Sequence, residues 1–120
     1  MTIDRGDPVH DRLSDIVNWG ERIHKYVADM KYDDFVADTR TQDAVIRCLE
    51  VIGEAASQIL KSDGDFERRH PELELTAAYR ARNRTAHGYG SVDLATVWRS
   101  ATVSCPEIVA VARRFLGEEQ

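Results

Sequence analysis

The sequence of 120 residues has few cysteines, no long apolar run and no strand-like alternation. Its two cysteines, Cys48 and Cys105, lie in apolar helical patterns without the spacing of metal ligands, which argues against a disulfide scaffold or a metal-bound domain. No apolar run is long enough to cross a membrane, and residues 1–7 lack the apolar core of a signal peptide. We therefore expect reduced, packed thiols in a cytoplasmic protein with no membrane partner.

The bulk composition is that of an ordinary globular protein, with 42% hydrophobic and 31% charged residues. The length predicts a single domain over residues 1–120. A net charge of -5 argues against a surface that attracts nucleic acid everywhere. The basic residues nevertheless gather in one stretch, which predicts a small phosphate-binding footprint. This stretch contains Arg68, Arg69, His70, Arg80, Arg82, Arg84 and His87.

Apolar residues recur at helical spacing along most of the chain, and no segment alternates with period two. The pattern predicts an all-α bundle of four main helices. A first helix follows Asp7-Pro8, which supply an N-cap and a proline at the first helical position. After a polar break over residues 31–38, a second helix is predicted from about Thr41 to Lys61. Its apolar face is wide enough for a central helix packed on two sides.

A third helix is predicted over residues 72–86, rich in alanine and arginine but poor in large apolar side chains. Gly88 and Gly90 end it, and a last helix begins near Ser91 or Asp93. Pro106 must kink or split this last helix, because proline lacks an N–H and its ring clashes with the preceding turn. The apolar spacing continues across Pro106, which favours a kink.

Most of the potential chemistry lies in residues 82–89, Arg-Asn-Arg-Thr-Ala-His-Gly-Tyr. On a regular helix, residues three, four and seven apart share a face. One cationic face therefore contains Arg80, Asn83, Arg84 and His87. Arg82 lies roughly 140° from His87, taking about 100° per residue. For these two residues to act together, the helix must unwind near its end or a second copy of the chain must contribute.

Each of these residues also has a purely structural interpretation. The arginines could be solvated, His87 could end the helix through a structural hydrogen bond, and Tyr89 could be a surface aromatic after a glycine turn. Glu54 on the central helix could be exposed or paired with Arg47, or it could form an inter-helix ion pair that positions Arg82 or Arg84. We predict packing roles for the tryptophans and surface positions for three histidines, namely Trp19, Trp98, His10, His24 and His70.

The pattern Arg82-x4-His87-x-Tyr89, with Asn83 directly after the arginine, resembles the signature of HEPN-domain proteins and in particular the HepT-like toxin family. The resemblance covers nearly the whole chain. Residues 41–55, with their Ile-Gly-Glu-Ala stretch, are similar to the second helix of that family. Residues 92–98 are similar to the start of its fourth helix. The lead-in at residues 76–81 is more alanine-rich and basic than the family pattern.

The resemblance implies a metal-independent endoribonuclease that acts as a homodimer with two motifs facing one cleft. It also implies a toxin of a type VII-like pair, in a larger toxin–antitoxin complex, whose antitoxin is a minimal nucleotidyltransferase that adenylylates Tyr89. In this reading Arg82 and His87 are catalytic, the substrate is RNA, and neither metal nor cofactor takes part. The supporting residues are Asn83, Arg80, Arg84 and Glu54.

The side chains suit this chemistry. RNA supplies its own nucleophile in the 2′-hydroxyl, so the enzyme needs only proton transfer and charge stabilisation. An imidazole such as that of His87 titrates near neutral pH, and a guanidinium such as that of Arg82 binds phosphate with two hydrogen bonds. No carboxylate lies near His87 in the sequence, so a hydrolase triad has no support. The alternative function is a non-catalytic helical module that presents substrate or nucleotide to a partner nucleotidyltransferase.

Overall fold

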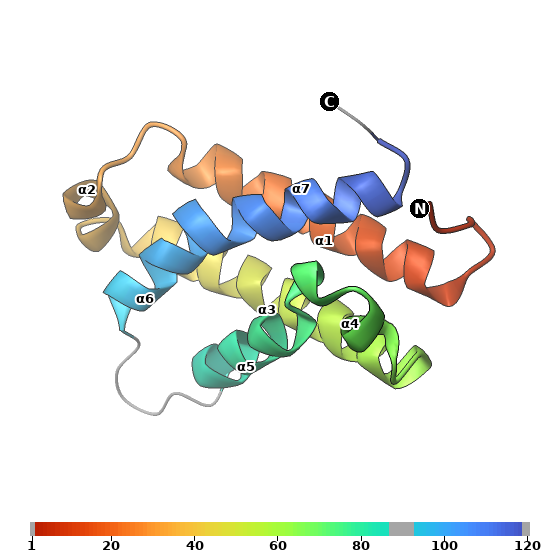
Figure 1. Ribbon diagram of the computed structural model, residues 1–120. Helices are drawn as coiled ribbons and strands as arrows, with labels where there is room; N and C mark the ends of the chain where they lie inside the picture. The colour runs from red at the N-terminus through yellow and green to blue at the C-terminus, as the bar shows by residue number, and fades with distance from the viewer. Residues whose placement is uncertain (1, 87–92, 119–120) are drawn as a thin grey trace.

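The computed structural model describes residues 2–86 and 93–118, and for residues 81–86 it describes the backbone alone. All regular elements in these ranges are helical, which confirms the predicted all-α bundle (Figure 1). In chain order they are α1 (Pro8–Val27), α2 (Tyr32–Val36), α3 (Thr39–Ser62), α4 (Phe66–Arg69), the 3-10 turn η1 (Pro71–Leu73), α5 (Leu75–Ala86), α6 (Leu94–Arg99), the π-helical turn η2 (Ser100–Ser104) and α7 (Cys105–Phe115). None of these helices is both long and apolar enough to cross a membrane.

Helix α1 begins as its sequence predicts. The Asp7 side chain accepts a hydrogen bond from the Val9 N–H at 2.9 Å, and Pro8 occupies the first turn, where a missing N–H costs nothing. Its buried residues recur every three or four positions and form one apolar stripe. That stripe packs against both α3 and α7.

Helix α3 is the central element, as the width of its apolar face predicts. It packs against α1 on one side and α5 on the other. It begins at Thr39 because Asp38 caps it: the carboxylate accepts hydrogen bonds from the N–H and the hydroxyl of Thr41, at 3.0 and 2.8 Å. Both bonds lower the pKa of Asp38, and the bond from the N–H has the larger effect. The cap therefore stays ionised and intact at neutral pH.

The predicted third helix starts three residues too early. Residues 71–73 form the 3-10 turn η1, and Glu74 adopts a left-handed conformation with φ of 50°. A residue with positive φ cannot continue a right-handed helix, so α5 begins only at Leu75.

The last helix is bent rather than broken, as the unbroken apolar spacing predicts. The Cys105 N–H donates to the Ser100 carbonyl, five residues back, so residues 100–104 form a π turn between α6 and α7. Pro106 then lies in the first turn of α7. The wider turn accommodates the proline without ending the helix.

Two thiols lie in the core, and a half-buried histidine lies at its edge. Cys48 and Cys105 are free and buried, as expected, and burial raises the pKa of the Cys105 thiol to about 12. His70 is not the surface residue that we predicted. Its ring lies 4.8 Å from that of Phe66 and 4.7 Å from that of Phe115, measured between centroids, and the buried Nε2 has no hydrogen-bond partner within the described ranges.

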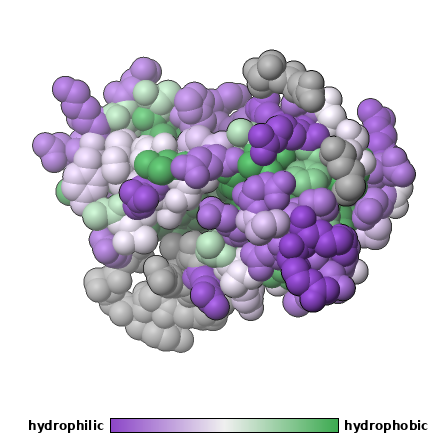
Figure 2. Space-filling view, in the orientation of Figure 1, coloured by the Kyte–Doolittle hydropathy of each residue, from purple (hydrophilic) through white to green (hydrophobic). Residues whose placement is uncertain are grey.

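The outer face seen in Figure 2 is mainly hydrophilic.

Helices α1 and α7 approach each other closely at Gly20. A Cβ placed on Gly20 would lie 2.2 Å from Val109 Cγ2 and 3.2 Å from Cys105 Sγ. Real carbon atoms do not approach so closely without moving one helix, so the packing of α1 on α7 requires glycine here.

We predict that Gly20→Ala lowers the free energy of unfolding by about 1–3 kcal/mol, the usual range for overpacking a core. Urea denaturation measures the change. Gly64→Ala is the matched control, because a Cβ at Gly64 meets nothing within 4 Å. Val109→Ala should restore part of the loss when combined with Gly20→Ala. Equal stability of the two glycine variants would contradict this account of the α1–α7 contact.

Candidate active site on α5

The motif-bearing helix α5 is held mainly through its contact with α3. Leu73 and Leu75 are fully buried at its start, and Ala78 packs against the core one turn later. Alanine has little bulk, so it lets two helix backbones approach closely. Large apolar side chains therefore anchor the beginning of α5, and small ones set the position of the rest.

A side-chain cap fixes the first turn of α5. The Glu67 carboxylate, from α4, accepts hydrogen bonds from the N–H of Thr76 at 2.7 Å and from its hydroxyl. A carboxylate at this position satisfies a free N–H and interacts favourably with the helix dipole. Glu67 thus links α4 to α5 and restricts the direction in which α5 runs.

The structure describes the predicted site residues to different extents. Arg80 is exposed on α5. Arg82, Asn83 and Arg84 belong to the same helix, which runs to Ala86, but their side chains lie outside the described set. His87 and Tyr89 also lie outside the described residues. The helix does not unwind before Ala86, so Arg82 and Ala86 keep ordinary helical spacing.

The chain resumes at Asp93, which caps α6. Its carboxylate accepts hydrogen bonds from the N–H groups of Ala95 and Thr96 at 3.0 and 3.4 Å, and from the Thr96 hydroxyl at 2.9 Å. The bonds from Thr96 are the main cause of the lowered pKa of Asp93. The end of α5 and the start of α6 lie at the same end of the bundle as α2 (Figure 1).

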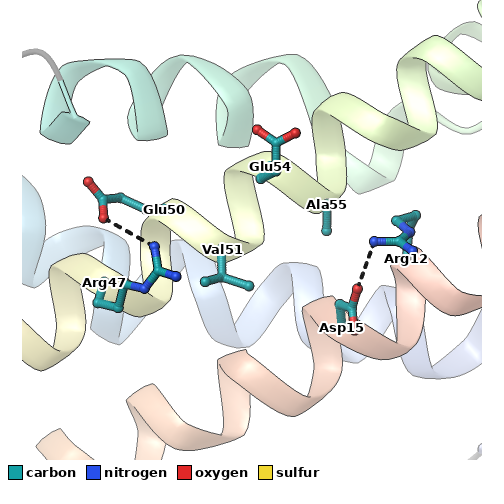
Figure 3. A pocket seen from close by; sticks show the side chains of 7 residues that line it. All are labelled: Arg12, Asp15, Arg47, Glu50, Val51, Glu54 and Ala55. Carbon is teal, nitrogen blue, oxygen red and sulfur yellow. Dashed lines mark hydrogen bonds and ion pairs between the residues drawn. The ribbon is translucent and has the colours of Figure 1, made fainter.

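Glu54 is half-buried on α3 and accepts a hydrogen bond from Gln58 Nε2 at 2.9 Å. Arg47, one of its predicted partners, lies 3.9 Å from Glu50 instead. In Figure 3 the Glu54 carboxylate points to the side of α3 on which α5 runs, whereas Val51 and Ala55 point towards α1. An ion pair from Glu54 to Arg82 or Arg84 involves side chains outside the described set.

A polar cavity of about 340 Å³ lies against α1 and α3, beside Glu54. Sequence analysis missed the two α1 residues that line this cavity, although their i,i+3 spacing and opposite charges predict an ion pair. The ion pairs Arg12–Asp15 and Arg47–Glu50, at 3.3 and 3.9 Å, line it together with Glu54 (Figure 3). Two arginines against three carboxylates leave one net negative charge, so this cavity does not suit a phosphate.

The predicted basic patch is divided in the structure. Arg68 pairs with Asp65 at 2.8 Å, and Arg69 pairs with Asp63. Both arginines belong to α4, which lies near the beginning of α5, whereas the motif lies near its end (Figure 1). Nearby carboxylates therefore offset the first half of the stretch, and Arg80 is the exposed cation of the second half whose side chain is described. Within residues 2–86 and 93–118, no three His, Cys, Asp or Glu side chains group as metal ligands.

Comparison with known proteins identifies the family. The family described as Ribonuclease HepT-like matches residues 19–115, from α1 to the end of α7. A protein of Thermococcus cleftensis named "Probable ribonuclease HepT" is 37% identical over 98 residues, covering 82% of this chain and 86% of the relative. "Putative RNase MJ0125" of Methanocaldococcus jannaschii is 38% identical over 96 residues, covering 80% of each chain. No solved structure matches.

The bundle and these matches define a small all-α protein of a ribonuclease class. The chain belongs to the HepT-like ribonuclease family, as the spacing of Arg82, His87 and Tyr89 predicts.

Proposed function

We propose that this chain is a metal-independent endoribonuclease whose active site is built around Arg82 and His87. The main support is the position of Arg82 near the end of α5, five residues before His87, in a chain of the HepT-like family. The anchored start of α5 and the capped start of α6 hold both ends of the motif segment.

The proposed reaction uses the 2′-hydroxyl of RNA as its nucleophile. The 2′-oxygen bonds to phosphorus as the bond from phosphorus to the 5′-oxygen breaks. This leaves a 2′,3′-cyclic phosphate and a 5′-hydroxyl. His87 accepts the proton from the 2′-hydroxyl, and an acid returns a proton to the departing 5′-oxygen. Arg82 binds the phosphate oxygens and stabilises the charge that develops on them.

The supporting residues follow from their places on the helices. Asn83 orients His87 or donates to the phosphate, and Arg80 and Arg84 extend the cationic face for the RNA backbone. Glu54 faces the side of α3 on which α5 runs, so it is suited to orient an arginine of α5 (Figure 3). Removing Glu54 would then misplace the arginine without removing a group that touches RNA.

The active unit that we propose is a homodimer. On a regular helix Arg82 and His87 of one copy point about 140° apart, so a second copy supplies the simpler source of the partner group. Two copies related by a two-fold axis bring two motifs to one cleft. The two His87 side chains then serve as base and acid.

Regulation through Tyr89 completes the proposal. We propose that a minimal nucleotidyltransferase acts as antitoxin and attaches AMP to Tyr89, within a larger toxin–antitoxin complex. In this transfer the phenolic oxygen bonds to the α-phosphorus of ATP and pyrophosphate leaves. The added bulk and negative charge beside Arg82 would block and repel RNA phosphates.

We predict that His87→Ala lowers RNA cleavage by at least about 100-fold, the lower range for loss of a general acid–base group. A fluorescent RNA of mixed sequence, incubated in EDTA, measures the rate. His24→Ala is the matched control, because His24 is exposed on α1. Full cleavage by His87→Ala protein free of contaminating nuclease would refute the mechanism. Loss of wild-type cleavage in EDTA would refute metal independence, and no wild-type cleavage at all would favour the non-catalytic module.

Mixed dimers test the shared cleft. A dimer of one wild-type copy and one His87→Ala copy, purified through two different affinity tags, should cleave RNA far below half the wild-type rate, because base and acid come from different copies. A rate of one half would show that each copy works alone.

Adenylylation has a direct mass readout. With the cognate nucleotidyltransferase and ATP, the peptide that contains Tyr89 should gain the mass of one AMP, and cleavage should fall in proportion to the modified fraction. Tyr89→Phe should gain no mass and stay active in the same mixture. An unchanged peptide mass in the wild-type protein would defeat this part of the proposal.

A further inference from the structure

Three aromatic rings of α2 and α6 form a series from the core to the surface. Phe35 of α2 is fully buried, and its ring centroid lies 5.2 Å from that of Trp98 on α6. The Trp98 ring in turn lies 6.2 Å from that of Tyr32, which is 39% exposed. Trp98 therefore packs as predicted, and the ring presented to solvent is that of Tyr32.

The backbone that holds this ring is fixed at both ends of α2. The Lys31 N–H donates to the Asp34 carboxylate at 2.8 Å at the beginning of the helix. At its end, Gln42 Nε2 donates to the carbonyls of Phe35 and Val36, at 2.9 and 3.0 Å. Tyr32 thus presents a pre-positioned aromatic surface, so a stacking partner loses little extra entropy by ordering it.

Trp98 is close to the motif along the chain, and α2, which carries Tyr32, contacts α6 at the end of the bundle where α6 begins (Figure 1). Trp98 is one turn into α6, roughly 6 Å along the helix axis from Leu94. Helix α6 follows residues 87–92, which carry His87 and Tyr89. The Tyr32 ring is thus joined, through Trp98, to the helix that directly follows the motif segment.

We propose that Tyr32, whose ring packs against that of Trp98, stacks on an RNA base that flanks the cleaved phosphate. The inference rests on the proposed function as an endoribonuclease and assigns it a base-binding subsite. Single-stranded RNA is commonly bound by stacking of its bases on aromatic rings, which tolerates different sequences.

The local charges indicate how this subsite contributes. Asp33 and Asp34 lie beside Tyr32 on α2, whereas Lys31 and Arg99 are the nearby exposed cations in sequence. This balance gives no net attraction for a phosphate. The contribution of Tyr32 must come from the ring and should depend little on salt, unlike contacts to the RNA backbone.

Val36 allows a base-binding subsite to be distinguished from a surface that docks a protein. Val36 lies one turn after Tyr32 on α2 and is 44% exposed. A protein partner would bury both side chains, because interface cores are apolar and continuous. A stacked base needs only the flat ring, so Val36→Ala should leave RNA binding unchanged.

The test uses a short single-stranded RNA with 2′-O-methyl groups, which binds but cannot be cleaved by 2′-hydroxyl attack. Fluorescence anisotropy of the full-length protein should show affinity reduced about 5- to 150-fold in Tyr32→Ala and in Tyr32→Leu, the range for loss of one stacked base. Tyr32→Phe should bind as wild type. The leucine variant retains apolar packing against Trp98, and thermal melts confirm that each variant is folded.

Matched controls and a double-mutant cycle locate the contact. Tyr26→Ala removes a tyrosine of similar exposure, 42%, on α1 and should not weaken binding. Moving a single abasic nucleotide along the RNA should reveal one position at which Tyr32→Ala no longer lowers affinity. The wild-type to Tyr32→Ala affinity ratio should stay constant as salt rises, while both affinities fall.

Three outcomes overturn the subsite: wild-type affinity in Tyr32→Ala, equal losses in Tyr26→Ala and Tyr32→Ala, or no sensitive abasic position. Weakened binding of the purified nucleotidyltransferase in both Tyr32→Ala and Val36→Ala, with RNA affinity unchanged, would identify a protein-docking surface instead. Because binding is measured without cleavage, a wild-type protein that binds through Tyr32 but cuts no RNA would refute the proposed activity and leave the subsite standing.

Discussion

The packing of α3 between α1 and α5 is the contact on which the rest of the structure depends. It combines a wide apolar face on one helix with partners on two sides, α1 and α5. Helix α1 has a second contact, with α7 through Gly20, so two helices hold it in position. Helix α5 relies mainly on α3. The position of the motif is therefore set by one helix–helix contact.

This dependence explains the composition of α5. A helix that carries several arginines near one end cannot also present a broad apolar face, because the charges would have to be buried. The chain concentrates the anchoring at the other end, in Leu73, Leu75 and the Glu67 cap of Thr76. The alanines between allow close contact with α3 at little entropic cost. The result is a helix that is fixed at its start and carries its arginines towards the other end.

The sequence predicted the elements whose signals are local. Apolar spacing and the Asp7-Pro8 pair placed α1, and the wide apolar face identified α3 as central. The start of α5 was missed because the left-handed conformation of Glu74 has no strong sequence signal in a glutamate. The contacts of His70 with Phe115, and of Tyr32 with Trp98, were missed because they join residues from distant parts of the chain. Such groupings arise only after the helices pack. The motif itself was recognised by spacing, which needs no tertiary structure.

The difference between local signals and contacts that form on packing also applies to the active site. Arg82 and His87 are near in sequence, yet helical geometry points them in different directions, so spacing alone does not make a site. What the fold adds is direction: α2 and α6 contact each other at one end of the bundle, and α5 runs from its anchored start towards the side on which α6 begins (Figure 1). Gln42 holds the end of α2 and Asp93 caps the start of α6 at this end, whereas Glu67 anchors α5 from its first turn, away from the motif. Beneath α2 and α6 the buried Phe35 packs on Trp98, so this part of the surface rests on apolar side chains as well as on polar caps.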